Sequence, residues 1–247
     1  GLFQIGNDSG ANIGMNSTKI QARSGGSASK LNLNVGGGDI DMGSSSSTIT
    51  SKGNFAVEGN LTVTGTATQM DALLLVDGTG ATDVNLDADY AITISGSNAT
   101  VTQANAYATA AGVVTATISN TDIADLDDLT TASTDQLTIT VASTSATAAQ
   151  LTTVSGATGL NVTATAVETI NNSSVAQVIA LIAAKGSSGD KINIDGDFTV
   201  TVNDTGTVDA GDLSTLDGKT TVDVNITNVT TLTATLTEVE QFFTDKN

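Results

Sequence analysis

Carboxylates are the side chains in this sequence best suited to chemistry, and they gather in two clusters. Their oxygens can ligate Ca²⁺, and two carboxylates that face each other across a groove can hydrolyse a glycosidic bond. The first cluster lies in TDIADLDDL, and the second surrounds a predicted strand at Phe198. The members are Asp122, Asp125, Asp127 and Asp128 in the first, and Asp190, Asp195, Asp197, Asp204, Asp209 and Asp212 in the second.

The first cluster lacks the pattern of a calcium loop. It has neither the alternating Asp or Asn and closing Glu of an EF-hand nor the GGxGxD repeat of calcium β-rolls. The start of a helix explains the acidity without a metal, with Thr121 as the N-cap and with Asp122 and Asp125 placed favourably against the helix dipole. No metal-binding residue is therefore predicted.

Turn formation explains most of the second cluster. Asp195–Gly196 and Asp217–Gly218 are common turn pairs. A cleft that binds sugar is usually lined with aromatic rings, whereas this chain has two Tyr and no Trp. The sequence predicts no catalytic and no cofactor-binding residue, and the protein is predicted not to be an enzyme. A polysaccharide depolymerase remains an alternative.

Three other features are explained more simply by structure than by a ligand. Gly36–Gly38 lacks the GK[ST] ending and the following helix of a phosphate loop, which favours a turn. Tyr107 could contact a ligand from the surface, but burial against a neighbouring repeat is favoured. The Asn-x-Ser/Thr triplets follow from the composition; examples begin at Asn60, Asn98 and Asn161.

The composition excludes most catalytic machinery. The chain has 247 residues and contains no Cys, His, Pro or Trp. The absence of Cys and His removes the usual nucleophile–base pairs, transition-metal sites and proton shuttles. Only 3% of the residues are aromatic and 14% are charged, and small β-branched residues dominate. Such residues suit strands that stack on copies of themselves, as in fibres and solenoids.

The charge argues against several partners. The formal net charge is −18, and basic residues occur only up to Lys52 and again from Lys185. An acidic surface repels phosphate, so neither nucleic acid nor an anionic membrane is expected to bind. No run of 18 apolar residues occurs, so no membrane insertion is expected. Because the sequence opens without Met, we expect it to be a piece of a longer polypeptide.

Residues 1–68 are predicted to form a fibre shaft. Short strands with alternating polarity begin at Lys19, Lys30, Asp39, Ser47, Phe55 and Leu61. So few large side chains can hardly offset the entropy lost on ordering one chain. We therefore expect a homotrimer in which apolar residues meet their symmetry mates. These are Ile20, Leu31, Leu33, Val35, Ile40, Ile49, Phe55, Val57, Leu61 and Val63.

Residues 69–89 are predicted to be a transition segment, with MDALLLV as a short helix or a buried strand. Residues 90–247 then repeat a strand followed by a helical stretch about every 23 residues. The strands are YAITI, VTATI, LTITV, LNVTA, FTVTV and VDVNI. This pattern predicts a parallel β-solenoid. The longer interval from Leu160 to Phe198 is an insertion or a repeat with a longer helix.

Two apolar groups stand out in this region. Val175, Val178, Ile179 and Ile182 follow the spacing of one helix face. Near the end, another alternating strand in TLTATLT is followed by Phe242 and Phe243. The two phenylalanines could cap the last repeat, or they could mark where a continuing chain was cut.

The sequence from Ile20 to Gly43, IQARSGGSASKLNLNVGGGDIDMG, resembles shaft repeats of phage tail fibres, and FAVEGNLTVTGTAT resembles the element that often ends such shafts. ATVTQANAYATAAGVVTATIS and TGTVDAGDLSTLDGKTTVDV are similar to repeats in large surface proteins of marine cyanobacteria and in structural proteins of their phages. The resemblance implies a trimeric shaft and contact with a host surface.

Together these features predict a mainly β protein, in which a trimeric β-shaft is followed by a parallel β-solenoid with short helices. The expected function is structural, in an extracellular virion appendage such as a tail fibre. Its expected partners are two further copies, other virion proteins, and a glycan or protein of the host surface. The alternatives are a bacterial adhesin or surface-layer protein, and a capsid-decorating or neck fibre.

Overall fold

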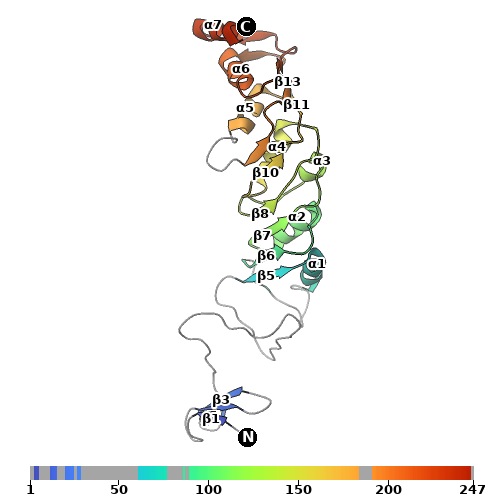
Figure 1. Ribbon diagram of the computed structural model, residues 1–247, viewed down its shortest axis with the longest axis vertical. Helices are drawn as coiled ribbons and strands as arrows, with labels where there is room; N and C mark the ends of the chain where they lie inside the picture. The colour runs from blue at the N-terminus through green and yellow to red at the C-terminus, as the bar shows by residue number, and fades with distance from the viewer. Residues whose placement is uncertain are drawn as a thin grey trace. The chain divides into compact units, whose positions relative to one another are not determined.

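The computed structural model (Figure 1) describes residues 3–5, 12–15, 20–24, 27–28, 61–76, 86, 89–183 and 191–245. The chain divides into two compact units, Gly1–Ala56 and Val57–Asn247. The strands predicted at Lys30, Asp39, Ser47 and Phe55 lie outside the described residues, as do Gly36–Gly38, Asn60 and Asp190.

The described part of the first unit is an antiparallel sheet with its strands in chain order. It comprises β1 (Phe3–Ile5), β2 (Asn12–Met15), β3 (Ile20–Ser24) and β4 (Ser27–Ala28). The strand predicted at Lys19 corresponds to β3, which pairs with β2 from Met15↔Ile20 to Asn12↔Arg23. Antiparallel pairing suits this segment because short connections can join such strands.

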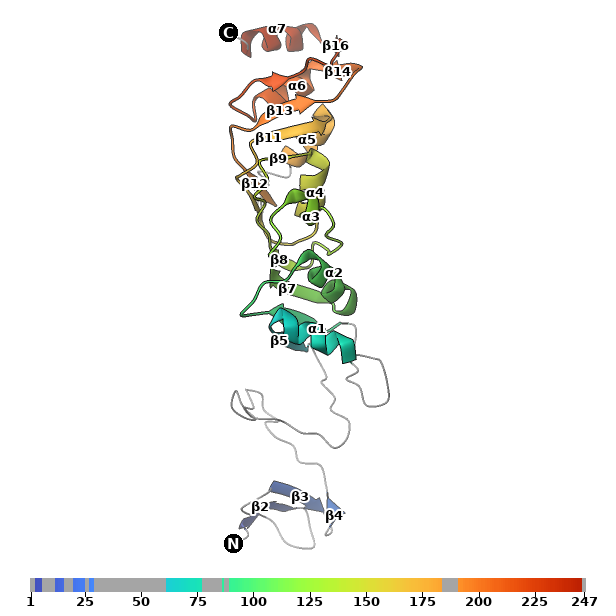
Figure 2. The same ribbon diagram turned by 90° about the vertical axis from the view of Figure 1, so that its right-hand side faces the viewer.

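The second unit alternates strands and helices. In chain order the elements are β5 (Thr62–Gly65), α1 (Ala67–Val76), β6 (Ala91–Ile94), α2 (Val101–Ala110), β7 (Val113–Thr117), α3 (Ile123–Leu126), β8 (Gln136–Thr138), β9 (Ser145–Ala146), α4 (Ala148–Gly156), β10 (Val162–Ala164), β11 (Thr169–Ser173), α5 (Val175–Ala183), β12 (Ile192–Ile194), β13 (Thr199–Val202), β14 (Thr207–Asp209), α6 (Ala210–Asp217), β15 (Val224–Asn225), β16 (Thr231–Thr233) and α7 (Leu236–Asp245). In Figure 2 the helices α1 to α6 follow one another along one side of the strands.

The first four strands of this unit form a parallel sheet in the order β5-β6-β7-β8. Alternating polarity sets the register, since Val63, Ile92 and Val114 pair across the sheet and form its inner row. Thr64, Thr93, Thr115 and Gln136 pair beside them as an outer row. The parallel pairing predicted from the repeat is confirmed here. β5 belongs to this sheet, although it precedes the boundary predicted at residue 68.

The later strands continue the parallel arrangement in three sheets. These are β9-β11-β13-β15, β10-β12 and β14-β16. An isolated parallel bridge, Thr140↔Thr163, links the segment that follows β8 to β10. The long interval from Leu160 to Phe198 holds β11, α5 and β12, so it contributes strands to two sheets as well as a helix.

Among the residues that the structure describes, helix accounts for 34% and strand for 27%, so the architecture is mixed α/β with parallel sheets. The expectation of a mainly β chain underestimated the helices. The segment MDALLLV lies in α1, the first of the two alternatives predicted for it. α7 occupies the segment that holds Phe242 and Phe243, where no helix was predicted. The described residues form no closed barrel.

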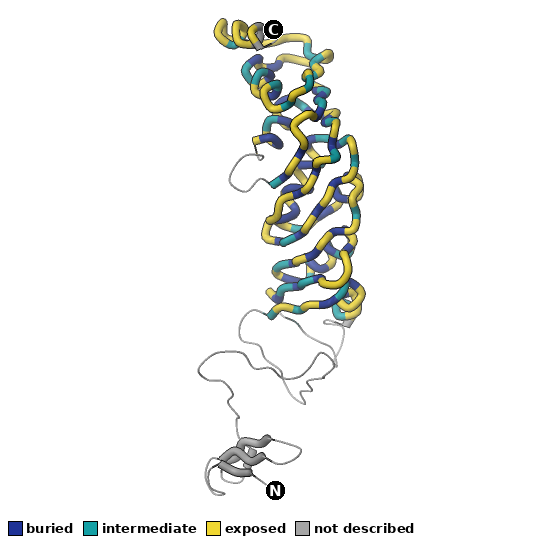
Figure 3. The backbone as a smooth tube through the Cα atoms, viewed as in Figure 1, coloured by how far each residue is buried: buried dark blue, intermediate teal, exposed yellow. Residues whose placement is uncertain are grey.

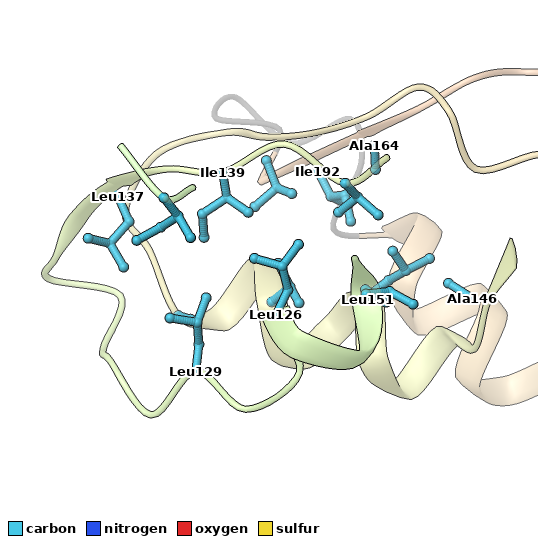
Figure 4. Packing of buried hydrophobic residues seen from close by; sticks show 14 of the residues in the cluster. Leu126, Leu129, Leu137, Ile139, Ala146, Leu151, Ala164 and Ile192 are labelled. Carbon is cyan, nitrogen blue, oxygen red and sulfur yellow. The ribbon is translucent and has the colours of Figure 1, made fainter. Parts of the chain in front are cut away.

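The core runs between the strands and the helices. Figure 3 shows buried and exposed residues alternating along the strands of the second unit. Figure 4 shows Leu137 and Ile139 on the strand side facing Leu126 and Leu129 beneath them. Each contributes a small or medium-sized side chain, and the largest fully buried ones are Tyr90, Tyr107 and Phe198. The core is therefore thin and continuous along the repeats.

Candidate functional site

A capping box starts five of the helices in the second unit. In α2 the Thr100 hydroxyl accepts from the Gln103 N–H at 3.2 Å, and the Gln103 side chain accepts from the Thr100 N–H at 2.9 Å. The same reciprocal pair satisfies two backbone donors that a helix start leaves free. The other boxes are Thr66/Gln69, Thr147/Gln150, Ser174/Gln177 and Thr235/Glu238.

A second set of bonds joins the starts of α1 to α5 to polar side chains further along the chain. The first N–H of α4, from Ala148, donates to the Ser173 hydroxyl at 2.8 Å, and that of α5, from Val175, donates to Asp204 at 2.8 Å. Ser97, Asn120 and Ser143 accept in the same way from the first residues of α1, α2 and α3. The acceptor lies 19 to 30 residues downstream of its donor.

We call these five acceptors, Ser97, Asn120, Ser143, Ser173 and Asp204, the seam. A helix N-terminus carries partial positive charge and unsatisfied N–H groups, so an oxygen from the next repeat is a favourable neighbour. Each of these five helix starts is thereby incomplete until the following repeat supplies its oxygen. The seam is a recurring contact that binds consecutive repeats to one another.

Two buried polar side chains hold strand ends at the middle of the unit. Asp135 is 3% exposed, and its carboxylate accepts from the N–H of Val114 at 2.7 Å and of Ala132 at 2.8 Å. Thr158 is fully buried, and its hydroxyl accepts from Leu137 N–H at 2.9 Å. Because an unsatisfied buried N–H is costly, both side chains stabilise positions that a neighbouring strand does not reach.

Tyr107 ties α2 to α1 from inside the core. Its side chain is buried, and its hydroxyl lies 2.7 Å from the Asp71 carboxylate and 2.9 Å from the Ala67 carbonyl oxygen. Burial raises the pKa of the Tyr107 phenol, and the hydrogen bond to Asp71 and the charge of Asp71 raise it further. Of the two interpretations of Tyr107, the structure therefore shows the one favoured from the sequence: the side chain is buried and is not exposed for a ligand.

One open hollow of the described surface is lined entirely by polar side chains. It measures about 310 Å³ and is bordered by Thr165, Glu168, Thr169, Asp195, Asp197 and Thr199. Thr169 and Thr199 pair across β11 and β13, and their hydroxyl oxygens lie 3.0 Å apart. The three carboxylates are exposed, whereas the general acid of a glycosidase is usually held in an apolar site. The hollow can accept hydrogen bonds from hydroxyl groups but lacks that feature of a hydrolase.

The structure uses the first acidic cluster for helix and seam contacts. The N-cap of α3 is Asp122, because its side chain accepts a hydrogen bond from the Ala124 N–H. The prediction of Thr121 as the N-cap was therefore wrong by one residue. Asp125 accepts from the seam residue Asn120 at 3.0 Å. No group of three or more potential ligands that could hold a metal occurs among the described residues.

The second cluster is spread over several roles. Asp195 and Asp197 border the polar hollow, and Asp204 belongs to the seam. Asp209 is the N-cap of α6, where its side chain accepts from Gly211 N–H at 2.9 Å, and Asp212 lies exposed in the first turn. The expectation that turns explain most of these residues therefore missed two helix-end contacts.

The seam and the capping boxes were missed from the sequence, although the boxes leave a signal. The letters TATQ, TVTQ, TAAQ, SVAQ and TLTE recur at the helix starts, with Gln or Glu three residues after Thr or Ser. The helix face predicted in α5 is largely correct, since Val175, Val178 and Ile182 are buried. Leu181 is also buried, whereas Ile179 is only half-buried.

Within the described ranges, no helix is long and apolar enough to cross a membrane. The side chains of Phe242 and Phe243 lie outside the described part. No protein-family model, no curated protein and no solved structure matches the chain.

Proposed function

We propose that the chain is a structural component of a bacteriophage virion appendage, a tail fibre that contributes to attachment at the host surface. The observation that carries this proposal is the seam, which joins the N-termini of α1 to α5 to the repeats that follow them. A chain stabilised in this way extends by adding repeats and needs no large core. Stiff extension is what a fibre requires.

The second unit is, in this proposal, a parallel β-solenoid. Successive strands pair in parallel, helices follow them along one side, and the inner rows are buried. The outer row of Thr64, Thr93 and Thr115 supports it, since uncharged hydroxyls on a strand face keep the exterior soluble without bulky side chains. The proposed partners are two further copies of the chain, other virion proteins and a host glycan or protein.

Attachment in this proposal is multivalent. Three equal copies present the same weak contact three times, and the second and third contacts form at a high effective concentration. The polar hollow at Glu168, Asp195 and Asp197 is a candidate for such a contact, because exposed carboxylates accept hydrogen bonds from sugar hydroxyls.

The decisive experiment is the native mass of the 247-residue chain in solution, determined by light scattering and by native mass spectrometry. The proposal expects a trimer and an elongated particle in electron micrographs. A folded monomer at all accessible concentrations would remove the basis of the fibre proposal.

A bacterial surface adhesin is the second candidate. It is favoured by the resemblance of ATVTQANAYATAAGVVTATIS to repeats of cyanobacterial surface proteins. Fluorescently labelled protein added to cyanobacterial cells separates the two candidates. Binding of the added protein that depends on the trimer supports the fibre, whereas binding of the added protein as a monomer supports the adhesin.

A further inference from the structure

We draw no further inference here: the strongest candidate, the polar hollow beside β11 and β13 that Glu168, Asp195 and Asp197 border, belongs to the site already described, and its three carboxylates are exposed with no second feature of the described residues that points to a ligand.

Discussion

The middle of the second unit and its last repeat are built from the same kinds of residues but differ in burial. Between β6 and α6 the inner side chains are nearly all buried, as at Ile92, Leu151 and Ile170. In β16 and α7 the apolar residues Leu232 and Leu236 are exposed. Burial in this unit therefore depends on a neighbouring repeat packed on each side rather than on the composition of any one repeat.

Core truncation should give the largest contrast between the two regions. Leu151→Ala, at a fully buried position in α4, should lower the free energy of unfolding by about 2–5 kcal/mol, because it leaves a cavity between repeats. Leu232→Ala should cost less than about 1 kcal/mol, because Leu232 is 43% exposed. Urea unfolding followed by circular dichroism measures both. Equal losses would contradict the comparison.

Removing a buried polar side chain should give the next largest loss in the free energy of unfolding. Asp135→Ala leaves the N–H groups of Val114 and Ala132 buried without their acceptor, at a cost of about 2–3 kcal/mol. Asp128→Ala is the control, since Asp128 is exposed, and its loss should be within about 0.5 kcal/mol. Urea unfolding of both variants at neutral pH is the measurement. A loss at Asp135 no larger than at Asp128 would show that water replaces the carboxylate.

Removing a seam acceptor should lower the free energy of unfolding more where the acceptor is buried than where it is exposed. Ser173 and Ser97 both accept from the first N–H of a helix, but Ser173 is 1% exposed and Ser97 is exposed. Ser173→Ala should cost about 1–2 kcal/mol and Ser97→Ala less than about 0.5 kcal/mol, because water can reach the Ala67 N–H after the second change. Thermal unfolding of the pair tests this. The reverse ranking would exclude the seam as a source of stability.

Tyr107 should make the contact between α1 and α2 sensitive to alkali. Its pKa is raised in the folded chain, so its contribution is complete below the ordinary tyrosine pKa of about 10 and is lost as the pH rises above it. Tyr107→Phe should cost about 1 kcal/mol at neutral pH through the lost bonds to Asp71 and Ala67, and the difference from wild type should shrink above pH ~10. Urea unfolding at pH 7 and 11 tests this, and a constant difference would contradict it.

The repeat could be predicted from the sequence, whereas its connections could not. Alternating segments such as YAITI and VTATI predicted β6 and β7 because small β-branched residues alternate with polar ones. VDVNI likewise covers β15, but β9 was not predicted, since a strand of two residues carries almost no periodicity. The seam depends on contacts at separations of 19 to 30 residues, which local patterns do not encode.

α7 is a helix that was not predicted although its sequence carries a helix signal. TLTATLT alternates like a strand, and its first three residues form β16 as predicted, but the Thr235/Glu238 capping box starts α7 within the same segment. The helix signal, Glu three residues after Thr, was present in the sequence, but the strand alternation outweighed it. Where a capping box and an alternating pattern overlap, the box decides, because it satisfies backbone donors that the helix start leaves free.

The smallest expected effect is a difference in how α7 and the other capped helices respond to acid. The capping box of α7 uses Glu238, whereas the other four boxes use Gln. The bonds from the Thr235 N–H and hydroxyl lower the pKa of Glu238, so this cap contributes above the ordinary pKa of 4.5 and is lost as the pH falls through the lower folded value. Carbon chemical shifts of α7 should therefore lose helical character in acid before those of α2 do. Glu238→Gln, which gives the box the same chemistry as Thr100/Gln103, should remove that difference, and a loss that persists in this variant would place its cause outside the cap.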